Sequence, residues 1–381
     1  MKNPTNSRAL ATVGILVFAC AAAFILFSKQ STSKNEQTVT IGVITPLTGE
    51  TATHGIRVKH GIELAIEEIN AAGGIQGKKV VALYEDSACD SSQAISAAYR
   101  LLAQNVAFFL GPQCSGAAMA TAPLLQERKS IMISSIASVP DLSLAGDYIF
   151  RNSETGAAHG DQMAQFAYNT LQSKKAAILH INLDNGLAYK NSFTETFEKL
   201  GGAIVSEQAY DQGTTDFRAQ ITKIKSSSPD VIYIAGQAAE HAIKQIRELG
   251  IDVPITSMNG IEVPELFEIV GSQTENIFFT SSAFNSEDDN ERISSFVKKY
   301  NSRYEEKAEA FSANSYDAMM ILAKSIASCV PEVDTTCVKE KLYEIEYDGV
   351  GGKTTFDEYG DVHKKLIVKT VKNGAFTPFF E

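Results

Sequence analysis

The chain has 381 residues, which is long enough for two lobes with separate cores. Apolar residues make up 44% of it and charged residues 21%, a mixture typical of a folded globular protein. The formal net charge is −11 and no basic stripe is present to neutralise phosphates, so the composition argues against nucleic-acid binding.

The first 37 residues form a segment with a composition of its own. Lys2 and Arg8 precede an uncharged apolar run, Ala9–Phe27, which as a helix would rise about 28 Å, close to the hydrocarbon thickness of a bilayer. Positive charge before an apolar run predicts export of the residues that follow. Three fates fit: an uncleaved anchor, which we favour because the run continues past Cys20, a cleaved signal peptide, or lipidation at Cys20. Each predicts a periplasmic or cell-surface protein that meets the membrane through this segment only.

Four cysteines lie in the part predicted to be exported: Cys89, Cys114, Cys329 and Cys337. None forms a CxxC pair and no His stands at zinc-ligand spacing beside them, so disulfides are a better interpretation than a metal site or a catalytic thiol. Proximity in the sequence favours Cys89–Cys114 and Cys329–Cys337, although spacing alone leaves the connectivity open.

From Thr38 onward, short β-rich runs alternate with helical patterns. The first block has the predicted strands TVTIGVI, KVVALYED, AFFLGP and SIMISS. Its first predicted helix carries Val58, Ile62 and Ile69 on one face and ends at Gly73. This βαβ rhythm predicts a parallel sheet covered on both faces.

A second block repeats the rhythm. Its predicted strands are AAILHIN, AIVSEQAY, VIYIAG, PITSM and IFFTSS, and its predicted helices are Ser192–Leu200, Phe217–Ser226, Ala238–Leu249 and Val263–Val270. Two further helices, Glu291–Tyr304 and Phe311–Ser328, a short helix after Thr335 and a hairpin-like tail follow. Two successive blocks predict an α/β fold of two doubly wound parallel-sheet lobes.

No catalytic or cofactor motif accompanies these elements. The sequence contains no Walker loop, GxGxxG, GxSxG or HExxH pattern. Open α/β sheets bind ligands beyond the carboxyl ends of their strands, and the loops there are rich in Ser, Thr, Asn, Gln and Gly without a nucleophile–base pair. The sequence therefore predicts a binding protein rather than an enzyme, with no cofactor and no metal.

Several ordered blocks resemble a known family. The run TIGVITPLTGETATHGIRVKHGIELAIEEINAAGGIQGKKV, then YEDSACD, GPQCSG and IMISSIASVPDL, and finally SYDAMMILAKSI are similar to type I periplasmic binding proteins of the branched-chain amino acid class. The resemblance covers residues 38–381. It implies the substrate-binding component of an ABC importer, with a transporter permease as partner and a small molecule as ligand.

The resemblance also implies an architecture of two lobes joined by a three-stranded hinge. The crossings are expected near 152–155, 281–284 and 362–365. Lobe 1 would comprise 38–155 and 284–364, and lobe 2 would comprise 156–283 and 365–381. Cys89 and Cys114 fall where leucine-binding relatives carry a disulfide.

Ligand contacts follow from the same resemblance. Ser115 matches a serine whose hydroxyl and backbone N–H hold an α-carboxylate. Ala137 matches a residue whose carbonyl faces the α-ammonium, and Ser138 matches a hydroxyl that bridges both groups. His54 matches an aromatic side chain that covers the ligand. Short hydroxyls beside helix amino termini suit a desolvated carboxylate on physical grounds as well.

Other positions depart from the family pattern. Asn259 stands where relatives commonly place the acid that pairs with the ammonium, so Asp184 or Glu262 would have to supply that charge. Asn185 and Gln237 stand where aromatic side chains are common. The expected ligand is a branched-chain or other amino acid, and a different carboxylate or an amide is the alternative. A ligand-sensing ectodomain on the same fold is the alternative to import.

Overall fold

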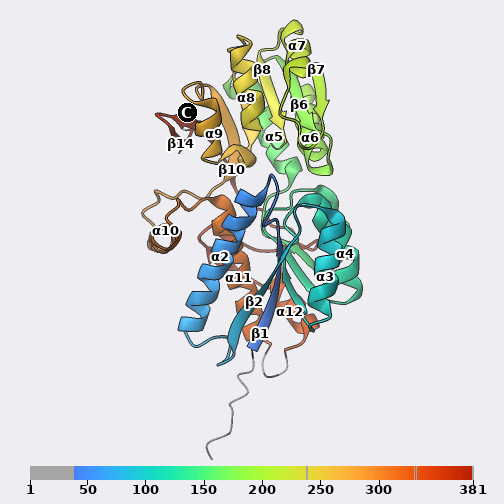
Figure 1. Ribbon diagram of the computed structural model, residues 1–381, viewed down its shortest axis with the longest axis vertical. Coiled ribbons are helices and arrows are strands. Elements are labelled where there is room, and N and C mark those ends of the chain that lie inside the picture. Colours follow the sequence, from blue (N-terminus) through green and yellow to red (C-terminus); the bar gives the residue numbers. More distant parts are fainter. Residues whose placement is uncertain (1–37, 237–238, 330, 332, 380–381) are drawn as a thin grey trace, which may run out of the picture. The chain divides into compact units, whose positions relative to one another are not determined.

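Two sheets organise the described part of the chain in the computed structural model, which covers residues 38–379 without 237, 238, 330 and 332 (Figure 1). The predicted anchor segment therefore lies outside the described residues. Within that described part, none of the helices combines the length and the apolar character needed to cross a bilayer.

The first sheet is five-stranded, in the order β2-β1-β3-β4-β5. Its strands are β1 (Thr38–Thr45), β2 (Lys79–Asp86), β3 (Phe108–Leu110), β4 (Ile131–Ser134) and β5 (Ile149–Arg151). β3 pairs in parallel with β1 and β4, and β4 pairs in parallel with β5. Parallel pairing aligns the carboxyl ends of these strands along one edge of the sheet.

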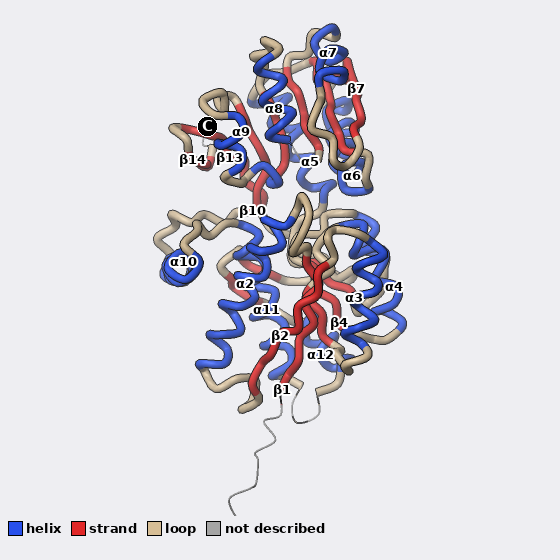
Figure 2. The backbone as a smooth tube through the Cα atoms, viewed as in Figure 1, coloured by secondary structure: helices blue, strands red, loops and turns tan. Residues whose placement is uncertain are grey.

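Alternate side chains of the first sheet enter two different cores, which explains its helical cover on both faces. Ile41 and Val43 pack in one core with α2, α10, α11 and α12, whereas Ile44 and Phe109 pack in the other with α3 and α4. Figure 2 shows α2 on one side of β1 and β2, and α3 and α4 on the other. These helices are α2 (Ala52–Ala71), α3 (Ser91–Leu102), α4 (Ser115–Glu127), α10 (Glu291–Tyr304), α11 (Ala310–Ala327) and α12 (Thr335–Tyr343).

The second sheet is seven-stranded, in the order β14-β13-β10-β9-β8-β6-β7. Its strands are β6 (Lys175–Ile181), β7 (Ala203–Tyr210), β8 (Val231–Ala235), β9 (Ile255–Met258), β10 (Ile277–Ser282), β13 (Leu366–Lys372) and β14 (Ala375–Pro378). Each neighbouring pair among β7, β6, β8, β9 and β10 is parallel. The C-terminal hairpin β13–β14 pairs with β10 through β13, and this pairing is antiparallel.

The second sheet is also covered on both faces. Ile232 and Ile234 of β8 pack with α7, α8 and α9, whereas Tyr233 packs with α5 and α6 on the other face. These helices are α5 (Gly156–Gln165), α6 (Asp184–Lys199), α7 (Arg218–Ser226), α8 (Ala239–Glu248) and α9 (Glu265–Val270). Three short helical segments remain: the 3-10 helices η1 (Pro140–Leu144) and η3 (Asn259–Ile261) and the π-helix η2 (Phe166–Thr170). The strands β11 (Tyr347–Gly349) and β12 (Gly352–Thr354) form a separate hairpin.

The chain passes between the two sheets three times, and both sheets belong to one compact unit, Val39–Glu381. The passages lie between β5 and α5, between β10 and α10, and between β12 and β13. The segment 152–155 follows β5, and its residues Ser153 and Glu154 line the cavity described below.

The predicted α/β fold with parallel-sheet lobes is confirmed, and so are both disulfides. Cys89 and Cys114 are bonded across a Cα–Cα distance of 5.4 Å, and Cys329 and Cys337 across 5.9 Å. The strand β5 was not predicted, and two helices also differ from the prediction. α6 begins at Asp184 rather than at Ser192, and α5 was not predicted, because its sequence GAAHGDQMAQ carries two glycines and only a weak apolar stripe.

Candidate ligand-binding site

A cavity of about 440 Å³ lies where loops from both sheets face each other. The first sheet contributes loops that follow β1, β2, β3 and β4, and the second contributes loops that follow β6 and β9. Its volume is that of a site for a small organic ligand. The carboxyl ends of parallel strands thus form this cavity, as the rule for open α/β sheets requires.

Hydrogen-bond donors gather at the amino terminus of α4. Cys114 is the residue before the helix and gives it no side-chain cap, and Ser115 is its first residue. The first N–H groups of a helix lack partners within it and attract negative charge. Ser115 Oγ accepts a hydrogen bond of 3.1 Å from the backbone N–H of Ser138, so its own proton is free to be donated into the cavity. This end of the cavity is suited to a carboxylate.

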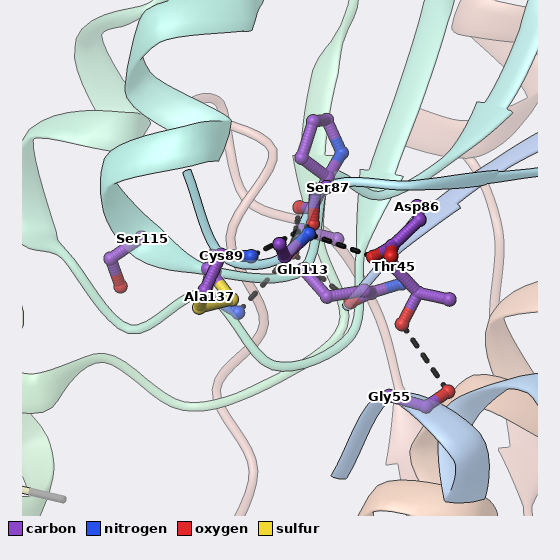
Figure 3. Close-up of a disulfide and its surroundings, with 12 residues drawn as sticks. Thr45, Gly55, Asp86, Ser87, Cys89, Gln113, Ser115 and Ala137 are labelled. Carbon is purple, nitrogen blue, oxygen red and sulfur yellow. Dashed lines mark hydrogen bonds between the residues drawn. A yellow bond between two sulfur atoms is a disulfide. The ribbon is translucent and has the colours of Figure 1, made fainter. Parts of the chain in front are cut away.

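Two further contacts hold the loops that carry these serines. The disulfide ties Cys114 to Cys89 in the loop after β2, and Figure 3 shows Ser115 on the helix that begins just beyond it. Gln113 Oε1 accepts hydrogen bonds from the backbone N–H of Ser135 at 2.9 Å and from its hydroxyl at 3.1 Å. The loops after β3 and β4 are therefore linked, which fixes the spacing of Ser115 from Ser138.

Tyr189 of α6 approaches the same serines from the second sheet. Burial raises the pKa of Tyr189 to about 12, and the Ser138 side chain acts on that pKa in the opposite direction. The backbone N–H of Gly156 donates to Ser138 O at 2.6 Å. The backbone of Ser138 is thus held by the first residue of α5.

The ionisable side chains around the cavity give it a negative balance. Burial lowers the pKa of His54 to about 4, with the charge of Arg57 adding to the effect, and burial lowers the pKa of His159 to about 3. Both imidazoles are neutral at pH 7. Three carboxyl groups line the cavity. Among the described residues, no Lys or Arg lines it. The carboxyl groups are those of Asp90, Glu154 and Asp184.

Glu154 is the feature of the site that the sequence did not reveal. Glu154 is only 4% exposed and lines the cavity. Its Oε1 has no hydrogen-bond partner within the described part of the chain. Burial raises the pKa of Glu154, against the opposing charge of Lys364. The available signal was its position just after a parallel strand, but the segment 152–155 was interpreted only as a hinge crossing.

The cavity brings together most of the predicted ligand contacts. His54, Ser115, Ser138, Asn185 and Asn259 all line it. Asp184, the acid predicted as an alternative ammonium partner, lines it too, on the exposed first turn of α6.

The remaining predicted contacts are Ala137, Gln237 and Glu262. Ala137 is buried between two lining residues, and its carbonyl accepts a 3.3 Å hydrogen bond from the Ser153 hydroxyl. Gln237 lies outside the described residues. Glu262 lines a second cavity of about 470 Å³, where its carboxylate accepts 2.6 Å and 2.8 Å hydrogen bonds from Lys369 and Ser281.

A family model for periplasmic binding proteins matches residues 38–375 of the chain. The chain belongs to this family. This periplasmic binding protein is similar to the Leu/Ile/Val-binding protein BraC3 of Rhizobium johnstonii, with 30% identity over 85% of this chain and 89% of that relative. The predicted resemblance to the branched-chain amino acid class is confirmed.

Solved structures agree with the family. A leucine-binding protein LivK from Thermotoga maritima matches with a TM-score of 0.85 and 29% identity, over 90% of this chain and 98% of that one. The branched-chain amino acid transporter substrate-binding protein LivJ from Streptococcus pneumoniae, solved with isoleucine, matches with a TM-score of 0.84 and 28% identity, over 90% and 99%. This periplasmic binding protein is accordingly an exported solute-binding protein and not an enzyme.

Proposed function

We propose that this protein is the substrate-binding component of an ABC importer and that it binds a branched-chain amino acid in the 440 Å³ cavity. The names of its relatives support the ligand class: BraC3 is called a Leu/Ile/Val-binding protein, and LivJ was solved with isoleucine. The proposal rests most on one observation: a single cavity combines helix N–H and serine donors with carboxyl groups. That combination is complementary to a zwitterion.

The carboxylate of the ligand would lie at the start of α4. Ser115 offers its backbone N–H and its hydroxyl proton there, and the Ser138 side chain is close by, since Ser138 N–H bonds to Ser115 Oγ. Several short donors replace the water that a carboxylate loses on burial, without a neutralising Arg. Hydrogen bonds to a charged group contribute about 1.5–3 kcal/mol each.

Apolar side chains supply a place for an aliphatic body. Ile136, Met258 and Phe311 line the cavity beside the polar groups. His54, which is neutral, packs edge-to-face on Phe311 with ring centroids 4.9 Å apart. Burying an aliphatic side chain against such a surface contributes about 1.5–3 kcal/mol, which suits a leucine-like ligand.

We also propose that two lobes, 38–155 with 284–364 and 156–283 with 365–381, close on the ligand about the three crossings. Support comes from the cavity lining, to which both sheets contribute, and from a hydrogen bond between α2 and α9. In that bond, Thr53 Oγ1 donates to Glu265 Oε1 at 3.2 Å. A ligand favours the closed state because only in that state does it bind to both lobes at once.

The N-terminal segment would keep the exported protein at the membrane, near the permease that receives the ligand. The support is the apolar run Ala9–Phe27, which extends past Cys20. Membrane fractionation of cells that produce the full chain tests this: the protein should stay with the membranes after a high-salt wash, and full release by the wash would contradict anchoring.

A thermal-shift screen of the purified full-length protein tests the ligand class. Leucine, isoleucine and valine should raise the melting temperature, because a ligand at 100 times its Kd stabilises the folded state by about 2.7 kcal/mol. Benzoate and simple amides serve as comparison ligands. A shift with benzoate and none with any amino acid would contradict the proposal.

A further inference from the structure

Glu154 is a buried carboxyl group whose charge, when ionised, the described residues do not balance. The residue is 4% exposed, and its Oε1 lacks a hydrogen-bond partner among the described residues although it lies on the cavity. A buried carboxylate is costly unless an opposite charge or several hydrogen bonds compensate it. Here the compensation has to come from the cavity side.

The positive charge of Lys364 acts on Glu154, but Lys364 is engaged elsewhere. Its Nζ donates to Asn314 Oδ1 at 3.2 Å, and the carboxylate of Asp317 also acts on its charge. Burial lowers the pKa of Lys364. Among the ion pairs of the described residues, none joins Lys364 to Glu154 within 4.0 Å. Lys364 therefore attenuates the charge of Glu154 without forming a direct pair with it.

Glu154 shares the cavity with the serines proposed to hold the ligand carboxylate. The preceding residue, Ser153, hydrogen-bonds to Ala137 O, so the segment around Glu154 lies against the loop that carries Ser138. The charge of Glu154 also acts on the hydroxyl of Tyr189, which lines the same cavity. Glu154 thus lines the same cavity as Ser115 and Ser138. In an α-amino acid one carbon separates the ammonium from the carboxylate.

The other acids of the site are already compensated. Asp90 is exposed and caps α3 by accepting a 2.8 Å hydrogen bond from Gln93 N–H. Asp184 is exposed on the first turn of α6, where water and the helix dipole stabilise its charge. Glu262 is paired with Lys369 in the second cavity. Glu154 alone among these four is both buried and unpaired on the cavity.

We propose that Glu154 pairs with the ligand ammonium and so selects an α-amino acid over the same molecule without its amino group. This inference rests on the proposed amino acid function. In this chain the acid comes from segment 152–155, next to the first turn of α5, while Asn259 takes no part in charge pairing. The ammonium would also lie near Ala137 O, which adds a neutral acceptor beside the carboxylate.

Calorimetric titration of the full-length protein with leucine and with 4-methylpentanoate, its deaminated analogue, tests the assignment. Glu154→Gln keeps the size of the side chain and removes its charge. We expect it to lower leucine affinity about 10- to 100-fold and to leave 4-methylpentanoate affinity unchanged or higher. Glu154→Asp, which keeps a carboxylate one methylene further back, should retain a preference for leucine. Its result also counts if Glu154→Gln does not fold.

Glu262→Gln is the matched control and should bind leucine like the parent, because Glu262 lines the second cavity and pairs with Lys369 there. Asp184→Asn tests the competing acid of the binding cavity. Equal weakening of both ligands in Glu154→Gln would overturn the assignment, because it would show a structural role only. So would an unchanged leucine affinity in Glu154→Gln, or a loss of leucine binding confined to Asp184→Asn. A parent protein that binds no amino acid would instead overturn the proposed function, and the assignment with it.

Discussion

The backbone N–H of Ser138 donates a 3.1 Å hydrogen bond to Ser115 Oγ. This bond joins the loop after β4 to the first turn of α4. Because Ser115 Oγ accepts this bond, the Ser115 hydroxyl can donate its proton to a ligand. Both residues line the cavity. The relationship makes these two serines a single donor site, whose members were predicted from separate blocks of the sequence.

Removal of either hydroxyl should therefore weaken binding without unfolding the protein. Ser115→Ala and Ser138→Ala should each cost about 1–3 kcal/mol of leucine binding free energy, since each removes a donor to a buried anion. Calorimetry measures the effect. Ser96→Ala is the matched control, because the Ser96 hydroxyl donates to Ser92 O on the exposed face of α3. Parent-like affinity in both cavity variants would show that the carboxylate lies elsewhere.

The disulfides make a prediction about thiol content. In the unfolded, unreduced full-length protein, only Cys20 should react with a thiol label, because Cys89, Cys114, Cys329 and Cys337 are paired. Mass spectrometry counts the labels before and after reduction. Reduction should add four labels, one for each cysteine of the two disulfides. Labelling of the four paired cysteines without a reductant would contradict the assignment.

Glu154 should destabilise the ligand-free protein at neutral pH. Burial raises its pKa in the folded state, so the folded protein holds the proton more tightly than the unfolded chain does. Such a carboxyl costs stability above its folded pKa, and the cost disappears below the unfolded pKa of about 4.3. Glu154→Gln should melt at a higher temperature than the parent at pH 7, with the difference vanishing near pH 4. A lower melting temperature at pH 7 would argue that the charge stabilises the fold.

The contact between α2 and α9 should contribute to affinity through closure. Thr53→Val removes the hydroxyl that donates to Glu265 while it keeps the shape of the side chain. We expect a loss of about 1 kcal/mol in leucine binding, or about fivefold in Kd. Thr222→Val, which removes a hydroxyl bonded within α7, is the control. Equal affinity in both variants would mean that this bond does not favour the closed state.

Much of the fold was predictable from periodicity, because the central strands are buried on both faces and read as continuous apolar runs. VIYIA of β8, for example, is buried throughout. Elements that depend on tertiary packing were harder to predict. α5 has little apolar periodicity of its own, and it is held by α6 through contacts such as the 2.6 Å bond from Ser192 Oγ to Ala157 O.

The site was predictable where a motif met a strand end, as at Ser115 and Ser138. Glu262 illustrates the limit of reasoning by proximity. It lies three residues from Asn259, yet the turn η3 intervenes and Lys369, more than 100 residues away, pairs with its carboxylate. Glu154 was missed for the converse reason, because only folding shows that a crossing segment is buried on the cavity.

A crystal structure of the protein grown with leucine tests the central claim most directly. We predict leucine in the 440 Å³ cavity, with its carboxylate within hydrogen-bonding distance of Ser115 N–H and the Ser138 hydroxyl and its ammonium facing Glu154. Leucine bound in the second cavity, or bound in the first with its carboxylate away from α4, would contradict this claim.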